Sequence, residues 1–411
     1  MMTNRDDVDV VIIGCGIIGM STALSLSRLG VKVKIIDDSD YNTVANNGKN
    51  LFRSYALSDS SMNFFKNIGL DIEGICCPML DILVYMSNYI NGPYSNVVEL
   101  SRRDTNIPVG FMVMDQRLRT MMLKSCFQKT EIDISFSQKT VKITRVSDSK
   151  VKLECADGRT YLSNMVIIAN GSSVTSTILG EEYSDLCVYT EYQYKQKAIV
   201  GNITHEKENK FIAHECFMPS GTFALLPLDQ HTSSYVWIEK ESYVQNMQKA
   251  NMEIFSHELG IRVGSALGEI QHFTEYEVFP LKMRVANRIA CERIALVGDA
   301  AKKIHPLAGQ GLNYGIRDVS ALRDVVLQDL QIGKIIGSSM SNEEYQSRRR
   351  FDNTMIAGIT TGINFGFTSI FSPIAGLCLE KTRNSNLIKG AIMNYASGTA
   401  CGRDIPSMLK I

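Results

Sequence analysis

Several features that would point to other classes of protein are missing from this sequence. Lys and Arg together number 43, as do Asp and Glu, so no excess charge favours binding to nucleic acid or an anionic membrane. The ten cysteines have no regular spacing, and the pair Cys76-Cys77 is not a CxxC element, which favours reduced intracellular thiols. The six histidines are scattered along the chain, and we therefore expect no metal site.

Long apolar runs and a leader segment are also missing. No stretch reaches the ~20 uninterrupted apolar residues that span a bilayer. The nearest, residues 356–379, is broken by glycines and a proline, and we interpret it as a packed helical segment, with contact to a membrane surface or a hydrophobic partner as the alternative. A strand-like run begins at Val8, leaving no room for a signal or transit peptide. We expect a cytoplasmic protein; a peripheral position on the inner membrane stays open.

The order of the expected elements indicates an α/β protein with two discontinuous domains and a helical C-terminal region. The chain opens as strand, glycine turn, helix and strand, whereas the middle is rich in β-branched and aromatic residues. The basic run at 348–350 is expected on a solvated helix face, with a phosphate or lipid contact as the alternative. We assign 1–75, 98–180 and 270–340 to a Rossmann-like domain, 76–97 and 181–269 to an inserted mixed sheet, and 341–411 to the helical region.

The first glycine motif is GCGIIG at residues 14–19, between an expected strand and an expected helix. Gly14 allows a tight turn, Gly16 lets the backbone approach a pyrophosphate, and Gly19 lets the helix pack close to the strand. The amides of the helix N-terminus, including that of Ile18, face the phosphates. Asp37 ends the second strand, where a carboxylate accepts a hydrogen bond from a ribose hydroxyl. The alternative is a tight turn without a ligand.

A second glycine motif follows a short apolar strand near residue 297. Asp299 is expected to accept hydrogen bonds from a chain of sugar-like hydroxyls. Further along, glycines bring backbone amides and a helix N-terminus close to an electron-rich group, which would stabilise negative charge there. The residues expected at this end of the cofactor are Pro306, Gly309, Gly311, Leu312 and Asn313. A packed strand-turn-helix is the alternative interpretation of the GDAA element alone.

Together these motifs make the chain resemble the class A flavoprotein monooxygenases, and among them the ubiquinone-biosynthesis hydroxylases. Three segments carry this resemblance: GDAAKKIHPLAGQGLN from Gly298, RSYALS from Arg53, and FMPSGTFALLPL at 217–228. The resemblance implies that Arg53 lies along the cofactor. The resemblance implies a glutathione-reductase-type domain with non-covalent FAD. It also implies molecular oxygen, reduction by NAD(P)H or a protein electron donor, and other quinone-biosynthesis proteins as partners. The implied reaction hydroxylates the ring of a polyprenylated phenol through a flavin hydroperoxide.

Candidate catalytic and substrate residues follow from these segments. His305 titrates nearest neutrality in its loop and, with Pro306, is the candidate for catalysis; a structural histidine is the alternative. The expected wall of the substrate pocket comprises Phe217, Phe223, Leu225 and Trp237. The alternative for these four is the core of the inserted sheet itself.

Two positions depart from the pattern of the family. Lys302 stands where the family usually has a histidine, which adds a charge. Asn170 stands where an aspartate is usual, and the serine and arginine that normally follow are absent, which removes a fork that pairs with phosphate. These departures favour a protein electron donor and leave two other functions open. One is a different FAD-dependent reaction, such as that of a reductase; the other is a non-catalytic flavin-binding subunit of a quinone-biosynthesis complex.

Overall fold

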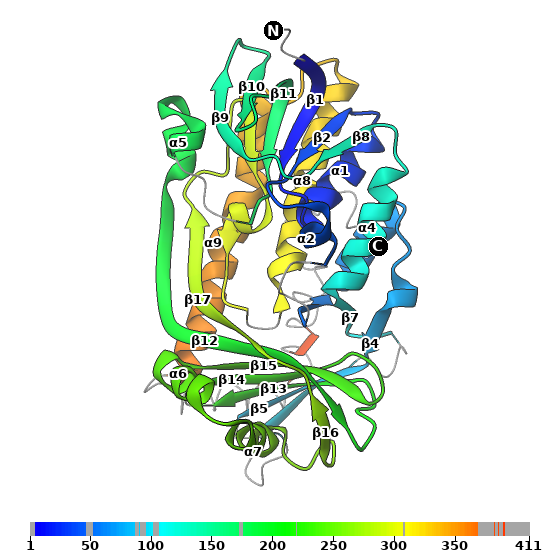
Figure 1. Ribbon diagram of the computed structural model, residues 1–411, viewed down its shortest axis with the longest axis vertical. Coiled ribbons are helices and arrows are strands. Elements are labelled where there is room, and N and C mark those ends of the chain that lie inside the picture. The colour runs from blue at the N-terminus through cyan, green and yellow to red at the C-terminus, as the bar shows by residue number, and fades with distance from the viewer. Residues whose placement is uncertain are drawn as a thin grey trace.

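A mostly parallel sheet forms the upper part of the computed structural model (Figure 1). Its central strand, β1, lies between β11 and β2, and β19 and β8 continue the parallel order on the two sides. β18 and the β9–β10 hairpin add antiparallel strands at the margin. The strands are β1 (Arg5–Ile13), β2 (Val33–Ile36), β8 (Ile132–Ser135), β9 (Thr140–Arg145), β10 (Val151–Cys155), β11 (Thr160–Ile168), β18 (Ala290–Cys291) and β19 (Ile294–Leu296).

The structure describes most of the chain, in several ranges. These are 5–46, 52–86, 96–101, 107–171, 176–218, 220–306 and 309–368, with the single positions 90, 382, 385, 389 and 390. The short elements within them are α2 (Tyr41–Asn46), α3 (Asp59–Asn67), α5 (Ser176–Leu179), η1 (Glu73–Ile75), η3 (Glu181–Cys187) and η4 (Gly298–Ala300).

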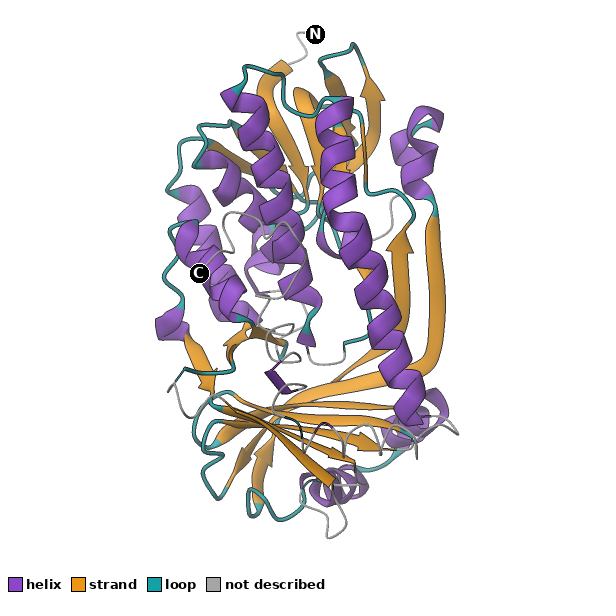
Figure 2. Ribbon diagram, turned by 180° about the vertical axis from the view of Figure 1, so that it is seen from behind, coloured by secondary structure: helices purple, strands orange, loops and turns teal. Residues whose placement is uncertain are grey.

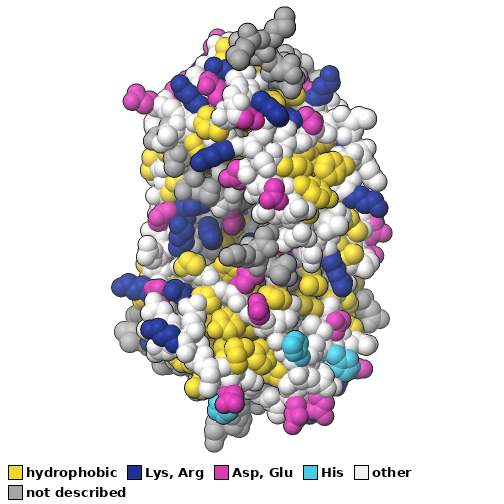
Figure 3. All heavy atoms as spheres, in the orientation of Figure 1, with side chains coloured by type: hydrophobic (Ala, Val, Ile, Leu, Met, Phe, Trp, Pro, Cys, Tyr) yellow, Lys and Arg dark blue, Asp and Glu magenta, His cyan; other side chains and the backbone are white. Residues whose placement is uncertain are grey.

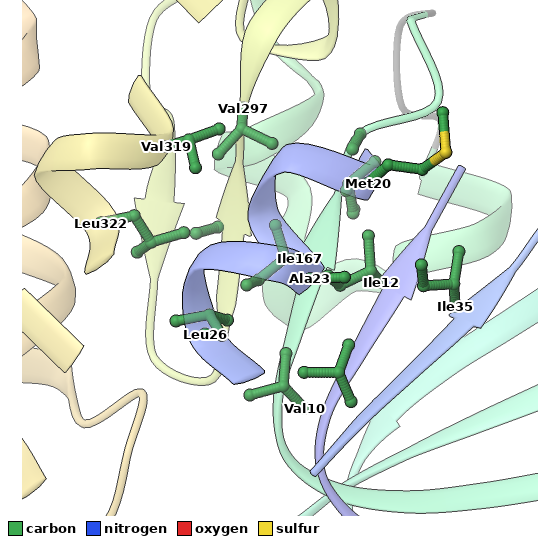
Figure 4. Close-up of a cluster of buried hydrophobic side chains, with 14 of the residues drawn as sticks. Val10, Ile12, Met20, Ala23, Leu26, Ile35, Ile167, Val297, Val319 and Leu322 are labelled. Carbon is green, nitrogen blue, oxygen red and sulfur yellow. The ribbon is translucent and has the colours of Figure 1, made fainter. Parts of the chain in front are cut away.

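Apolar side chains of the parallel sheet and two helices form the upper core (Figure 4). α1 (Ile17–Ser27) contributes Met20, Ala23 and Leu26, and α8 (Gly311–Gln331) contributes Val319 and Leu322. α1 also contacts α4 (Asp115–Phe127). Strands covered by helices lose the polar-apolar alternation of a half-exposed strand, which explains the apolar runs at the chain start and before residue 298.

A nine-stranded sheet, the substrate sheet, forms the lower part (Figure 1). Its pairing is antiparallel except between β13 and β5. α6 (Glu241–Lys249) and α7 (Met252–Val263) cover the face that points away from the upper part. The strands are β5 (Asp81–Met86), β6 (Asn96–Ser101), β12 (Tyr189–His205), β13 (Ile212–Met218), β14 (Gly221–Pro227), β15 (Thr232–Lys240), β16 (Ile270–Phe273), β17 (Glu277–Ala286) and β20 (Lys302–Lys303).

The pairing moves three of the expected domain boundaries. β16 and β17 pair with β12, so residues 270–286 belong to the substrate sheet and not to the Rossmann-like domain. β6 continues the substrate sheet to Ser101. Residues 76–79, expected in the substrate sheet, instead pair in a small sheet of β3 (Ser54–Leu57), β7 (Gly110–Met114) and β4 (Cys76–Met79). Strand pairing between distant segments sets these boundaries, and sequence composition does not reveal it.

A long C-terminal helix, α9 (Ser339–Thr368), runs from the parallel sheet down to the substrate sheet (Figure 2). It confirms the expected helical segment, although residues 369–379 of the apolar run lie outside the described residues. Arg349, expected on a solvated face, is buried with 3% of its surface exposed. Within the described part of the chain, no helix is long and apolar enough to cross a membrane.

Candidate functional site

The first glycine turn joins β1 to α1, and each glycine has a different steric environment. Gly14 has φ +106°, and a Cβ there would lie 2.6 Å from the carbonyl oxygen of Ala169. A Cβ on Gly19 would lie 1.9 Å from the carbonyl oxygen of Gly14, so α1 packs directly on the turn. A Cβ on Gly16 would meet no atom within 4 Å. Two glycines therefore shape the turn, while the third leaves an open approach to the helix N-terminus.

Asp37 holds this turn against the end of β2. Its Oδ2 accepts a hydrogen bond from the Cys15 amide at 2.6 Å, and its Oδ1 accepts one from the Ser39 amide at 2.9 Å. Each carboxylate oxygen has a further lone pair, which leaves acceptor capacity for a ribose hydroxyl. Asp37, which the sequence predicts to bind a ribose hydroxyl, thus also fixes the shape of the turn.

The second glycine turn lies directly against the first. Ile18, on the first turn of α1, packs between Gly298 and Gly315: added Cβ atoms on these glycines would come within 3.1 Å and 2.6 Å of its side chain. The Val297 amide also donates to the carbonyl of Ile168, next to the first turn. Two segments almost 300 residues apart in the chain therefore meet at one site, as the sequence predicted.

The N-terminus of α8 is the second helix end at this site. The side chain of its N-cap residue, Gln310, makes no capping hydrogen bond, and Gly311 is exposed with no atom within 4 Å of an added Cβ. Gly309 has φ +62° and its amide donates to the carbonyl of Pro306 at 3.0 Å. α1 likewise has no side-chain cap at Gly16. Each uncapped N-terminus presents amide donors and partial positive charge to an anionic group.

Asn313 is held by the protein itself. Its Oδ1 accepts from the Ser58 amide at 3.1 Å and the Ser61 hydroxyl at 2.7 Å, and its Nδ2 donates to the carbonyl of Ala56 at 2.9 Å. It is 1% exposed. Its side chain therefore fixes α8 against the RSYALS segment, and we infer that it contributes to cofactor binding by positioning that helix.

Charged side chains surround Asp299 between the two parts of the molecule. Burial lowers the pKa of Lys303, Arg53 and Arg284 lower it further, and Asp299 opposes them. Arg284 also donates to the Asp299 carbonyl at 3.0 Å. Figure 3 shows several Lys and Arg side chains at mid-height on the left of the molecule, where the upper and lower parts meet. Arg53 and Asp299, both predicted from the sequence, thus lie within electrostatic range of one another.

Arg119 on α4 lies near the first glycine turn, and the sequence analysis did not single it out. Its Nε lies 2.9 Å from Asp115, whose other oxygen accepts from the Tyr55 hydroxyl at 2.7 Å. Burial raises the pKa of the Cys15 thiol, and Arg119 lowers it in part, which sets the arginine charge near the first glycine turn. The only signal in the sequence is an Asp–Arg pair four residues apart, which is common on ordinary helices.

Lys302 is neutralised by a buried carboxylate. Asp318 is completely buried and lies 2.6 Å from Lys302 Nζ and 2.8 Å from Arg349 Nε. It also accepts a hydrogen bond from the Gly298 amide at 3.1 Å. Burial lowers the pKa of Lys302 to about 8. The charge that departs from the family pattern is therefore paired, and the same carboxylate connects α8, α9 and the second glycine turn.

His305 lies against the substrate sheet and is 1% exposed. Its ring packs edge-on against Tyr194 at 4.7 Å, where an irregularity in β12 between Gln193 and Lys197 interrupts the pairing. Neither ring nitrogen has a hydrogen-bond partner among the described residues. Burial lowers the pKa of His305 to about 4, so the imidazole is neutral near pH 7 and matches a hydrogen-bonding role better than proton transfer at that pH.

The expected substrate wall divides between the two faces of the substrate sheet. Phe223, Leu225 and Trp237 pack against α6 and α7 on the outer face, where they form the core of the lower part. They therefore cannot line a pocket beside the glycine turns, and that assignment is wrong. Phe217 lies one position from Cys216, a member of that outer core, and so belongs to the opposite face.

The site fits a dinucleotide. It has two uncapped helix N-termini, two glycine positions open to a ligand and a carboxylate at the end of β2. Phosphates bind at such helix ends, and sugar hydroxyls bind at such carboxylates. Among the described residues, no group of His, Cys, Asp and Glu could hold a metal ion.

Comparisons with known proteins agree with this geometry. The model of the FAD binding domain family matches residues 7–331. Ubiquinone hydroxylase UbiL of Rhodospirillum rubrum is 30% identical over 408 residues, covering 98% of this chain and 92% of that protein. The 3-demethoxyubiquinol 3-hydroxylase of Escherichia coli is 26% identical, covering 97% and 100%. The crystal structure of PqsL, a probable FAD-dependent monooxygenase from Pseudomonas aeruginosa, superposes with a TM-score of 0.74 at 18% identity, covering 92% and 100%.

The fold and the paired glycine turns thus define a flavoprotein that binds FAD. The chain belongs to the FAD binding domain family and, within it, to the group of the ubiquinone hydroxylases.

Proposed function

We propose that this protein is an FAD-dependent monooxygenase that hydroxylates the aromatic ring of a polyprenylated phenol in ubiquinone biosynthesis. The observation that supports it most directly is the meeting of two glycine turns above the inner face of a substrate sheet. The similarity to ubiquinone hydroxylases over nearly the whole chain supports the substrate class.

FAD, when bound, supplies the redox chemistry that activates molecular oxygen. The chain itself would hold the cofactor and orient the substrate beside it. The α1 N-terminus and Asp37 would bind the pyrophosphate and ribose, and the α8 N-terminus would stabilise negative charge at the flavin ring. Cys77, Met79 and Met112 form a buried apolar cluster with Ala213 on the inner face of the substrate sheet, which would help to exclude water there.

The electron donor is NAD(P)H or a protein in this proposal. Asn170 is exposed and uncharged where an aspartate is usual, which supports a protein donor. The second departure, Lys302, is paired with Asp318 and so supplies no reason to expect lost activity. A non-catalytic subunit is therefore the weaker candidate.

The cellular context is also part of the proposal. We infer a cytoplasmic enzyme that associates with other quinone-biosynthesis proteins and touches the inner membrane at its periphery. The exposed apolar side chain of Ile363 at the lower end of α9 supports the last point, since a prenylated substrate resides in the membrane. Fractionation of cell extracts tests it: the protein should appear in the membrane fraction at low salt, and its complete absence there contradicts the contact.

The test of function uses FAD-loaded protein, a reductant and ¹⁸O₂ with a short-tailed prenylphenol. We expect one labelled oxygen atom in the ring of the product and consumption of oxygen that depends on the phenol. Reduced flavin that consumes oxygen without labelling any phenol would contradict the proposal. Deletion of the gene should lead to accumulation of a quinone precursor that lacks one ring hydroxyl.

A further inference from the structure

Glu215 lies in the middle of β13, with Val84 of β5 and Ala224 of β14 opposite it in register. Side chains alternate along a strand, so His214 and Cys216 point to the face opposite that of Glu215. Cys216 belongs to the outer core under α6 and α7. Glu215 therefore points to the opposite, inner face of the substrate sheet.

The inner face looks toward the second glycine turn. Ala213, two residues before Glu215 and hence on the same face, packs in a cluster with Met112, and Ala56 packs against that cluster. Ala56 is also the nearest neighbour of Gly309, 3.3 Å from an added Cβ. Glu215 thus shares its face of the sheet with Ala213, whose cluster extends through Ala56 to Gly309 in the loop expected at the flavin.

The carboxyl of Glu215 has no protein partner in the part of the chain that the structure describes. Among the described residues, none donates a hydrogen bond to it, and no charged side chain shifts its titration. It keeps some exposed surface although its strand neighbours Phe217 and Ala213 are buried. Burial raises the pKa of this carboxyl to about 7. The partly exposed carboxyl therefore keeps free acceptor capacity, and a ligand with a hydrogen-bond donor would find an acceptor here.

We propose that Glu215 binds the ring hydroxyl of the phenolic substrate and accepts its proton during hydroxylation. This inference rests on the proposed function. As the ring loses electron density in the transition state, the O–H bond breaks, its electron pair stays on the ring oxygen, and the proton moves to a carboxylate oxygen of Glu215. The phenol has an ordinary pKa of about 10, so the transfer becomes favourable only as the ring reacts, and a base that titrates near neutral pH suits this task.

The central test compares Glu215→Gln with wild type. The substitution keeps the shape but removes the charge, and we expect kcat/KM for a prenylphenol to fall about 100-fold. In wild type, kcat/KM should rise as the pH increases through 7 and Glu215 loses its proton, and Glu215→Gln should abolish this rise. Glu215→Asp keeps a carboxylate and should retain the rise with reduced kcat. Glu208→Gln is the matched control, because Glu208 is an exposed glutamate in the turn before β13 and should behave as wild type.

A binding measurement tests the same residue without turnover. Calorimetry on the oxidised, FAD-loaded protein compares a prenylphenol with its methyl ether, which cannot donate a hydrogen bond. Wild type above pH 7 should prefer the phenol by about 10- to 100-fold, the range expected for a hydrogen bond to a charged group. Glu215→Ala should bind both equally, while its visible spectrum shows that FAD is retained.

Two results separate the inference from the function. If wild type hydroxylates the phenol and Glu215→Gln keeps its kcat/KM and its pH profile, Glu215 has no such role and the proposed function stands. If wild type hydroxylates no prenylphenol, the proposed function fails. The preference for phenol over ether then still decides whether Glu215 binds a ring hydroxyl: its presence in wild type and loss in Glu215→Ala supports the role, and equal binding overturns it.

Discussion

Gly16 and Gly19 lie three residues apart, yet replacing each by alanine should have opposite consequences. An added Cβ at Gly19 would lie 1.9 Å from the Gly14 carbonyl oxygen, so α1 must move away from the turn. Overpacking of this kind costs about 1–3 kcal/mol. Gly16 has φ −76° and ψ 178°, which alanine adopts readily, and its Cβ would enter open space. At this N-cap position the loss of glycine costs less than about 1 kcal/mol.

Gly16→Ala should instead weaken the binding of FAD, although it hardly affects the stability of the apoprotein. The new methyl group occupies the direction from which the pyrophosphate approaches, and displacement of the phosphates weakens their bonds to the α1 amides. Loss of one hydrogen bond to a charged group costs about 1.5–3 kcal/mol, so the affinity for FAD should fall about 10- to 100-fold.

Thermal unfolding of the apoprotein and fluorescence titration with FAD separate the two effects. Gly16→Ala should unfold close to the wild-type temperature and bind FAD weakly, whereas Gly19→Ala should unfold earlier even without FAD. Gly74→Ala, an open glycine in η1 outside the site, serves as the control. Wild-type affinity for FAD in Gly16→Ala would refute the assignment of this opening to the cofactor.

Three further predictions concern ionisable groups in buried or half-buried positions. Asp318→Asn should lower the free energy of unfolding, measured with denaturant, by about 3–5 kcal/mol, because Lys302 and Arg349 lose a shared buried carboxylate. Adding Lys302→Met should recover part of this loss, and a loss under about 1 kcal/mol in the single variant would contradict the pairing. His305→Asn should keep the rise of kcat/KM near pH 7, because the wild-type imidazole, with a pKa lowered to about 4, does not titrate there; disappearance of the rise would assign it to His305. Glu215 has a pKa raised from 4.5 to about 7, so its contribution to stability is complete below pH 4.5 and falls by up to about 3 kcal/mol as the pH rises through 7. Glu215→Gln should remove this pH dependence from the free energy of unfolding, and the same pH dependence in both proteins would show that the carboxyl titrates normally.

The parts of the site that depend on local geometry were predictable from the sequence. The two glycine turns impose steric demands that short motifs express directly, and the structure brings both together around Ile18. Asp37 at the end of β2 also holds the expected place beside the first turn.

The parts that depend on distant pairing were not predictable. A strand pattern shows that Phe223 and Leu225 share one face, but which face meets α6 and which meets the flavin side is set by the assembled sheet. The burial of Arg349 depends on Asp318, 31 residues earlier on another helix. Glu215 gives no signal in the sequence, since an isolated glutamate in a strand is ordinary until its apolar surroundings are known.

The presence of FAD in the isolated protein tests the central claim most directly. Heat or acid should release the flavin without proteolysis, and its amount should approach one equivalent per chain after reconstitution. Such a result, combined with weak binding in Gly16→Ala, would place the first glycine turn on the cofactor. Folded wild-type protein that remains colourless and takes up no FAD in titration would contradict the account.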